Sequence, residues 1–355
     1  MTVTTVDIGP KQLAENTTSA PEGFVIDSEQ LFQVQLFVAN ALELPITKDK
    51  MQFDDIREAY SLIHKHCSEW QSDIYPSIVS LATDIYDYGT SAQTIYGAIG
   101  KLATQISESD DMSLSSPEVK KFYRLVDNLI AKATDYEQRA IKVSDDVTRF
   151  SNYCHDHDRN LDKLYVVYEA KFIGNNQKIK ELQNQKKVQE DRLAKANADY
   201  HHYVVVAATT PTYMWIPLVG WIAGGVVLGI YIDRAVKAKN DAEDAARQIV
   251  DLIQKLSDEV RVVSEIEKAK KGVHDIDKQL ETALEALGKI QSAWSAIAAD
   301  LTKLKVLVAD VIAHHNNLIV ADIYIDDAIL KWKNLAEKAD TYRMKAYANF
   351  LPKTA

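Results

Sequence analysis

Residues 200–232 contain no Asp, Glu, Lys or Arg, although charged residues make up 26% of the chain. The segment reads YHHYVVVAATTPTYMWIPLVGWIAGGVVLGIYI and ends abruptly at Asp233 and Arg234. Charged stretches with helical periodicity and few Gly or Pro residues flank it on both sides. A membrane-spanning helix needs about 20 apolar residues to cross about 30 Å of hydrocarbon. The chain therefore combines a membrane-competent segment with flanks that are typical of a water-soluble helical protein.

The apolar segment is longer than one membrane span and shorter than two, and Pro211 and Pro217 divide it. This division favours a hairpin with its turn at residues 211–217 over a single straight span. Two Gly-x-x-x-Gly spacings, Gly220/Gly224 and Gly225/Gly229, allow close helix approach in lipid. Aromatic residues lie near the turn and at the opposite end, as in interfacial belts.

We therefore predict that residues 196–239 form a membrane-inserting hairpin head. Its candidate membrane-inserting residues are Tyr203, Val204, Val205, Val206, Pro211, Tyr213, Trp215, Ile216, Pro217, Leu218, Gly220, Trp221, Ile222, Gly224, Gly225, Val226, Val227, Leu228, Gly229, Ile230 and Tyr231. The alternative from the residues alone is a buried core hairpin in a soluble protein. His201 and His202 stand at the mouth of the segment, where protonation below about pH 6.5 would disfavour entry into lipid.

The composition favours helix almost everywhere, because Ala, Leu, Lys, Glu, Gln and Asp abound while Gly is scarce at 12 residues. A net charge of −10 argues against nucleic acid as a partner, and two cysteines are too few for a disulfide framework. The sequence contains no phosphate-binding glycine loop and no convincing nucleophile–base pair, so we predict neither enzymatic activity nor a cofactor. The N-terminus lacks the features of a cleavable signal peptide, and residues 1–24 predict a disordered leader.

Proline and glycine positions divide the rest of the chain into helical stretches. Helices are expected over 28–44, 49–73 and 77–107, with breaks at Pro45 and Pro76. Two longer arms follow, one from Pro117 to Pro211 and one from Leu218 to Leu351, although either arm is open to breaks.

The second arm has a heptad pattern in which every seam position except His315 is apolar, as in a coiled coil or long bundle. The seam consists of Val273, Leu280, Leu287, Trp294, Leu301, Val308 and His315, with Ile276, Ala283, Ile290, Ile297, Leu304, Val311 and Leu318. The first arm is less regular, with Phe122, Leu125, Leu129, Tyr136, Val143, Val147 and Phe150 on one face, followed by Leu161, Leu164, Val167 and Tyr168.

Together these patterns predict an all-α fold: an elongated helical bundle with two long antiparallel coiled-coil arms and an apolar hairpin tip. Residues 25–195 with 240–355 would form the tail bundle, and residues 196–239 the head.

Two short clusters combine residue types that bind metals. They are His64 to Cys67, and Cys154 to Asp158 with His155 and His157 inside. No Cys-x-x-Cys pair accompanies them, so we interpret both as polar faces of long helices and predict no metal site.

The layout resembles the α-helical pore-forming cytolysins of the cytolysin A type, and more closely the xenorhabdolysin-like binary toxins. The two long arms and the Pro-, Gly- and Trp-rich tip at residues 200–232 carry this resemblance over essentially the whole chain, with no short signature motif. At 355 residues the chain looks like the smaller, B-type component.

The resemblance implies a lytic, haemolytic virulence factor that is released from a bacterium without a cleavable signal peptide and is soluble as a monomer. It would assemble with a longer A-type subunit as a hetero-oligomeric ring on the target-cell lipid membrane, and insert its tip hairpins as a pore. The alternative is a membrane-anchored coiled-coil scaffold or tether with one span at about 213–232.

Overall fold

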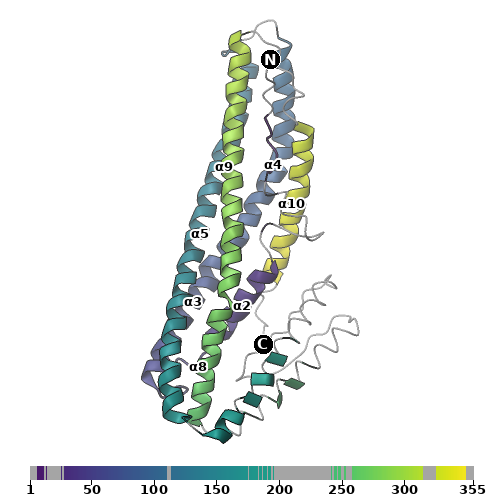
Figure 1. Ribbon diagram of the computed structural model, residues 1–355. Coiled ribbons are helices and arrows are strands. Elements are labelled where there is room, and N and C mark those ends of the chain that lie inside the picture. Colours follow the sequence, from purple (N-terminus) through teal and green to yellow (C-terminus); the bar gives the residue numbers. More distant parts are fainter. Residues whose placement is uncertain are drawn as a thin grey trace. The chain divides into compact units, whose positions relative to one another are not determined.

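The computed structural model describes residues 6–11, 13, 25, 28–109, 113–174, 176–182, 184–185, 187–189, 191–192, 195, 241, 244–245, 247–248, 252, 258–314 and 325–348. Within these ranges the chain forms helices and turns and contains no strand. The elements are α2 (Ser28–Leu42), α3 (Asp54–Glu69), the π-helical turn η1 (Trp70–Ile74), α4 (Tyr75–Ser107), α5 (Pro117–Phe172), α8 (Asp258–Asp275), α9 (Asp277–His314) and α10 (Ile325–Ala348). The predicted all-α fold is confirmed, and Figure 1 shows these long helices.

The chain divides into two compact units. Unit 1 comprises Met1–Phe32, Ser72–Arg149 and Gln279–Tyr347, and unit 2 comprises Gln33–Gln71, Phe150–Lys278 and Ala348–Ala355. The predicted tail bundle is therefore shared between two units, each with its own core.

Unit 1 is built around an aromatic cluster that joins four helices. Tyr88 of α4 lies with its ring centre 5.0 Å from that of Trp294 of α9 and 4.7 Å from that of Trp332 of α10. Tyr136 of α5 completes the cluster at 5.1 Å from Trp294. Aromatic pairs in such geometries add about 0.5–1.5 kcal/mol each beyond the area that they bury.

The heptad prediction for the second arm is confirmed at every position that the structure describes. Each seam residue from Val273 to Val311 is at most 7% exposed, and Trp294, Leu301 and Val308 are fully buried. His315 and Leu318 lie outside the described residues. A regular apolar repeat thus translated directly into a buried helix face.

Unit 2 packs α3 and the C-terminal part of α5 together. The ring centres of Trp70 and Phe150 lie 4.6 Å apart, and Trp70 is fully buried. At the end of α5, Phe53 packs edge-on against Tyr168, and the Tyr168 hydroxyl donates a 2.7 Å hydrogen bond to Asp55. These contacts hold the end of α5 against the start of α3.

The antiparallel pairing of the two arms follows from cross-helix ion pairs. In unit 2, Lys270 of α8 pairs with Asp162 of α5, and Asp277 at the start of α9 pairs with His155 of α5. From the first pair to the second, the position moves seven residues forward along the second arm and seven residues back along α5. In unit 1, Lys305 of α9 pairs with Asp127 of α5. The predicted antiparallel arrangement of the arms is therefore present in each unit.

Several boundaries differ from the sequence-based expectations. Pro76 does not break the chain, because it lies in the first turn of α4, where a missing N–H costs little, and η1 joins α3 to α4 directly. The first arm breaks after α5 ends at Phe172, where Gly174 has φ +50°, and helical residues resume at Gln177.

The second arm also departs from a single helix. It has a turn at Ile276, between α8 and α9, and α10 packs back on α9 through the stacked rings of Trp294 and Trp332. Val167 was assigned to the buried face of the first arm and is instead 59% exposed.

Residues 1–24 are predicted to be a disordered leader, and the structure describes a part of them. Val6, Ile8 and Leu13 are at most 2% exposed, because their apolar side chains are buried in unit 1. The remaining residues of 1–24 lie outside the described residues.

Candidate functional site

The predicted head, residues 196–239, lies outside the described residues, and so does every candidate membrane-inserting residue from Tyr203 to Tyr231. The Gly-x-x-x-Gly pairs, His201 and His202 and the alternative span at 213–232 fall in the same range. Among the residues that the structure does describe, no helix is both long and apolar enough to cross a membrane. The site is therefore defined here by its two flanks.

The two flanks of the apolar segment meet through an arginine. On the N-terminal side, Arg192 places one guanidinium nitrogen 2.9 Å from Asp244 and the other 3.4 Å from Asp241 on the C-terminal side. Gln248 donates a 2.8 Å hydrogen bond to the same Asp244 carboxylate. The two flanks of the apolar segment therefore lie next to each other, as a hairpin requires.

Buried and charged residues also lie close to this ion pair along both flanks. Ala245 is fully buried and Leu252 is 8% exposed, so the C-terminal flank has an apolar face as well as an acidic one. Lys271 of α8 lies 3.3 Å from Asp191, which ties the N-terminal flank to a further helix. Since these ion pairs are about half exposed, each contributes about 0–1 kcal/mol. Their main effect is to set which residues of the two flanks face each other, and they add little to the stability of the fold.

A rigid corner precedes the N-terminal flank. After α5 ends at Phe172, the amides of Ile173 and Gly174 both donate to the Glu169 carbonyl, at 2.9 and 3.0 Å. The positive φ of Gly174 is the left-handed conformation that a helix C-terminus favours and that glycine adopts without strain. The chain therefore turns at a defined residue before it enters the flank.

The ammonium of Lys171 strengthens the same corner. It lies 5.0–5.8 Å from the ring centres of Phe172, Tyr168 and Phe53. A cation over aromatic faces at such distances is attracted by the ring quadrupoles.

The two clusters with metal-binding residue types meet between α3 and α5, contrary to their interpretation as separate polar faces. His66 Nδ1 lies 2.9 Å from His157 Nε2, and the His66 ring stacks on Tyr153 at 3.7 Å. Cys67 and Cys154 are 2% and 3% exposed. Among the described residues, no group of three or more His, Cys, Asp or Glu side chains has the geometry to hold a metal ion.

The pKa values of this cluster follow from its burial. Burial, with a smaller effect of the neighbouring His66, lowers the pKa of His157 to about 4 against an opposing effect of Asp156. Burial also lowers the pKa of His66 and raises the pKa of both thiols. At neutral pH both imidazoles are therefore uncharged, and one of the two facing nitrogens donates its proton to the other.

Two groups of interacting residues, one in each unit, were not anticipated from the sequence. The pairing of Arg192 with Asp241 and Asp244 was missed, although the mixed charges beyond the apolar segment were visible. Asp84 of α4 is 4% exposed and accepts a 2.6 Å hydrogen bond from Arg139 of α5, yet an isolated Asp within a helix gives no sequence signal.

The comparisons with known proteins agree with this architecture. The pesticidal crystal protein Cry6Ba of Bacillus thuringiensis is 24% identical over 369 residues, which covers 92% of this chain and 89% of that protein.

Two solved structures have the same fold. One is soluble SmhA of the tripartite α-pore-forming toxin of Serratia marcescens, with a TM-score of 0.68 and 13% identity over 99% of this chain and 98% of that one. The other is the Bacillus cereus HblL1 toxin component, with a TM-score of 0.65 and 14% identity over 99% and 100%.

The predicted resemblance to helical pore-forming toxins is confirmed by these folds together with a family match. The sequence model of the Bacillus haemolytic enterotoxin (HBL) family matches residues 9–200, which is more than half of the 355 residues. The chain therefore belongs to the Bacillus haemolytic enterotoxin (HBL) family.

Proposed function

We propose that this protein is a component of a pore-forming toxin, which folds in water and then permeabilises a target membrane through the head at residues 196–239. The observation that carries the proposal is an uncharged stretch, residues 200–232, whose two charged flanks meet at Arg192, Asp241 and Asp244. Membership of a haemolytic enterotoxin family supports the same activity. The proposed activity is physical and needs no catalytic group.

A second component is part of the proposal. SmhA belongs to a tripartite α-pore-forming toxin, and HblL1 is described as a toxin component, so multi-component assembly is the pattern among proteins of this fold. We propose that this chain forms a hetero-oligomeric ring with a partner subunit on the lipid membrane. The longer, A-type identity of that partner rests on the resemblance to xenorhabdolysin-like toxins.

Substitution of Val226 by Lys tests the role of the head. A lysine near the centre of the hydrocarbon costs about 2.5–3.5 kcal/mol on insertion scales, so dye release from liposomes in the presence of the partner subunit should fall by at least tenfold. The unfolding transition, measured by circular dichroism in water, should stay within about 0.5 kcal/mol of the unsubstituted protein.

Two outcomes count against the proposal. Unchanged dye release from Val226→Lys with an unchanged fold would mean that the segment has no role in the membrane. Unfolding of Val226→Lys in water would show that the segment is a structural core hairpin.

A further inference from the structure

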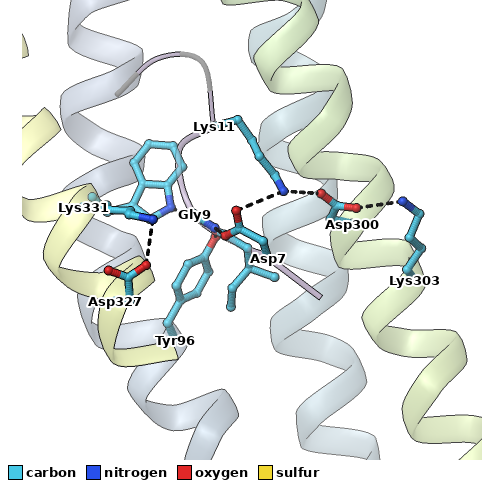
Figure 2. A network of polar contacts seen from close by, with 10 residues as sticks. Asp7, Gly9, Lys11, Tyr96, Asp300, Lys303, Asp327 and Lys331 are labelled. Atoms are coloured by element: carbon cyan, nitrogen blue, oxygen red, sulfur yellow. Dashed lines mark hydrogen bonds and ion pairs between the residues drawn. The ribbon is translucent and has the colours of Figure 1, made fainter. Parts of the chain in front are cut away.

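The N-terminal segment Val6–Lys11 lies in unit 1 without belonging to any of its helices. Figure 2 shows it passing close to α4, α9 and α10, with the Lys11 side chain directed toward Asp300 of α9 and the Asp7 side chain directed toward Gly9 and Lys11 of the segment itself. Val6 is 2% exposed and Ile8 is fully buried. A short non-helical stretch with its own apolar anchor is therefore inserted among three helices.

Two of the helices bind the same backbone atom of the segment. The carbonyl oxygen of Ile8 accepts a 2.9 Å hydrogen bond from the Tyr96 hydroxyl of α4 and a 3.2 Å bond from the Trp332 indole N–H of α10. Both donors are fully buried. Leaving a buried donor without its acceptor costs about 1–3 kcal/mol, so the carbonyl is a specific recognition point.

The third helix binds the cationic end of the segment. Lys11 Nζ lies 2.7 Å from Asp300 of α9 and 3.4 Å from Asp7 of its own segment. Lys303 also contacts Asp300, at 2.9 Å. Burial opposes ionisation of Asp300, but the two ammonium groups outweigh burial and hold the pKa of this carboxyl below its ordinary value. Asp300 is thus a charged acceptor ready for a lysine.

The segment has a defined bend that presents these groups. The Gly9 amide donates a 2.8 Å hydrogen bond to Asp7, and a Cβ added at Gly9 would lie 2.9 Å from that same carboxylate oxygen. Lys11 has φ 50°, and the Leu13 amide donates to the Pro10 carbonyl at 3.1 Å. A larger residue at position 9 would therefore displace the Asp7 carboxylate from the Gly9 amide.

We propose that unit 1 contains a peptide-binding groove between α4, α9 and α10, whose ligand is the chain's own N-terminal segment, acting as a releasable clasp on α10. The groove holds the segment through the buried Ile8 side chain, the Ile8 carbonyl and the ion pair between Lys11 and Asp300. Among the described residues, the backbone–backbone hydrogen bond given for the segment joins the Leu13 amide to the Pro10 carbonyl and involves neither α4, α9 nor α10, so release of the segment breaks no helix.

Release would uncover the aromatic side chains that the segment covers. Tyr96 and Trp332 lie directly beneath Ile8, and Trp332 adjoins Tyr88 and Trp294 in the core cluster. Newly exposed apolar patches are typical of protein interaction surfaces. The clasp therefore controls both the mobility of α10 and access to this aromatic surface, and this inference does not depend on pore formation.

Adding the segment back as a free peptide is the direct test. A chain that lacks residues 1–13 is titrated with a synthetic peptide of residues 5–13, with tryptophan fluorescence for binding and thermal unfolding for stability. We expect the deletion to lower the Tm by several degrees and the peptide to bind saturably and restore it. A control peptide with Ile8→Asp, which carries a charge at the buried anchor, should neither bind nor restore. An unchanged Tm on deletion, or no binding of the unsubstituted peptide to a folded deletion variant, would overturn the proposal.

The full-length chain provides a second test if the deletion variant does not fold. Hydrogen exchange should show the amides of residues 6–13 and of α10 opening together, at conditions where α9 stays protected. Lys11→Gln should accelerate this opening by up to about fivefold, since it removes a partly buried ion pair with Asp300. Exchange of residues 6–13 only through opening of the whole of unit 1 would contradict a releasable clasp.

Discussion

His157 lies in unit 2 with its Nε2 atom 2.9 Å from Nδ1 of His66, and only one proton fits between the two nitrogens. Because burial holds the pKa of His157 at about 4, the unfolded chain binds more protons than the folded chain between about pH 4 and 6.5. The contribution of His157 to stability is therefore complete above pH 6.5 and is lost as the pH falls toward 4. The loss amounts to at most about 3 kcal/mol.

We predict that the free energy of unfolding falls between pH 7 and pH 5 and that His157→Gln reduces this fall. Glutamine keeps a hydrogen-bonding group opposite His66 but does not titrate. Chemical denaturation at the two pH values measures the difference. An equal fall in both proteins would show that this imidazole does not control the acid response.

The contribution of Asp84 in unit 1 to stability changes with pH in the opposite direction to that of His157. Burial raises its pKa to about 6, while the Arg139 guanidinium acts in the other direction. A carboxyl whose folded pKa lies above its unfolded value adds stability at low pH, and this stability is lost as the pH rises through about 6. In the same measurement, Asp84→Asn should therefore steepen the fall in stability toward pH 5. A shallower fall would contradict the pKa direction.

At the scale of elements, α9 offers a matched pair of positions. Leu301 is fully buried on the heptad seam, whereas Val306 on the same helix is 64% exposed. Leu301→Lys should destabilise the folded protein by about 3–5 kcal/mol, because it removes a buried side chain and introduces an unpaired charge. Val306→Lys should change stability by less than about 0.5 kcal/mol. Urea unfolding of both variants measures the change in the free energy of unfolding. Similar changes at both positions would contradict the assignment of Leu301 to a buried heptad seam.

The elements that the sequence predicted are those with a local, repeated signal. The α9 seam repeats every heptad, and Pro117 marks the start of α5, so periodicity and capping rules were sufficient. Gly174 follows the end of α5 and is the single glycine between Pro117 and Pro211. A lone glycine can lie within a helix or end it, and the positive φ of Gly174 shows that it ends this one.

What the sequence could not predict depends on contacts between distant residues. The His66–His157 hydrogen bond joins two helices that are far apart in the chain, and Arg192 meets Asp241 and Asp244 across the whole apolar segment. The docking of Ile8 on Tyr96 and Trp332 is similar, because a short polar-looking leader has no period that marks it as buried. Side-chain pairing of this kind is decided by tertiary packing, which a local pattern does not contain.

For the whole molecule, the family relationship leads us to expect that pore formation needs a second protein component. We predict that this chain alone causes little dye release from liposomes and that a second helical component, added at equal concentration, increases the release by at least tenfold. The second component is expected because SmhA and HblL1, which share this fold, are components of multi-part toxins, whereas the length of the head requires only that several chains lie side by side. Full activity of this chain alone at low concentration would contradict the two-component proposal and leave pore formation intact.

The central claim is that residues 196–239 enter lipid. A fluorophore that reports the polarity of its environment, attached at Val226→Cys, tests this most directly. The native thiols of Cys67 and Cys154 do not compete for the label, because both are buried and their pKa values are raised. A second protein, labelled at Val306→Cys on the exposed face of α9, is the control.

When liposomes and the partner subunit are added, the account predicts brighter, blue-shifted emission from position 226, and quenching of that emission by a quencher placed in the acyl chains. Position 306 should show neither change. Dye release from the liposomes while position 226 remains in water would contradict the claim.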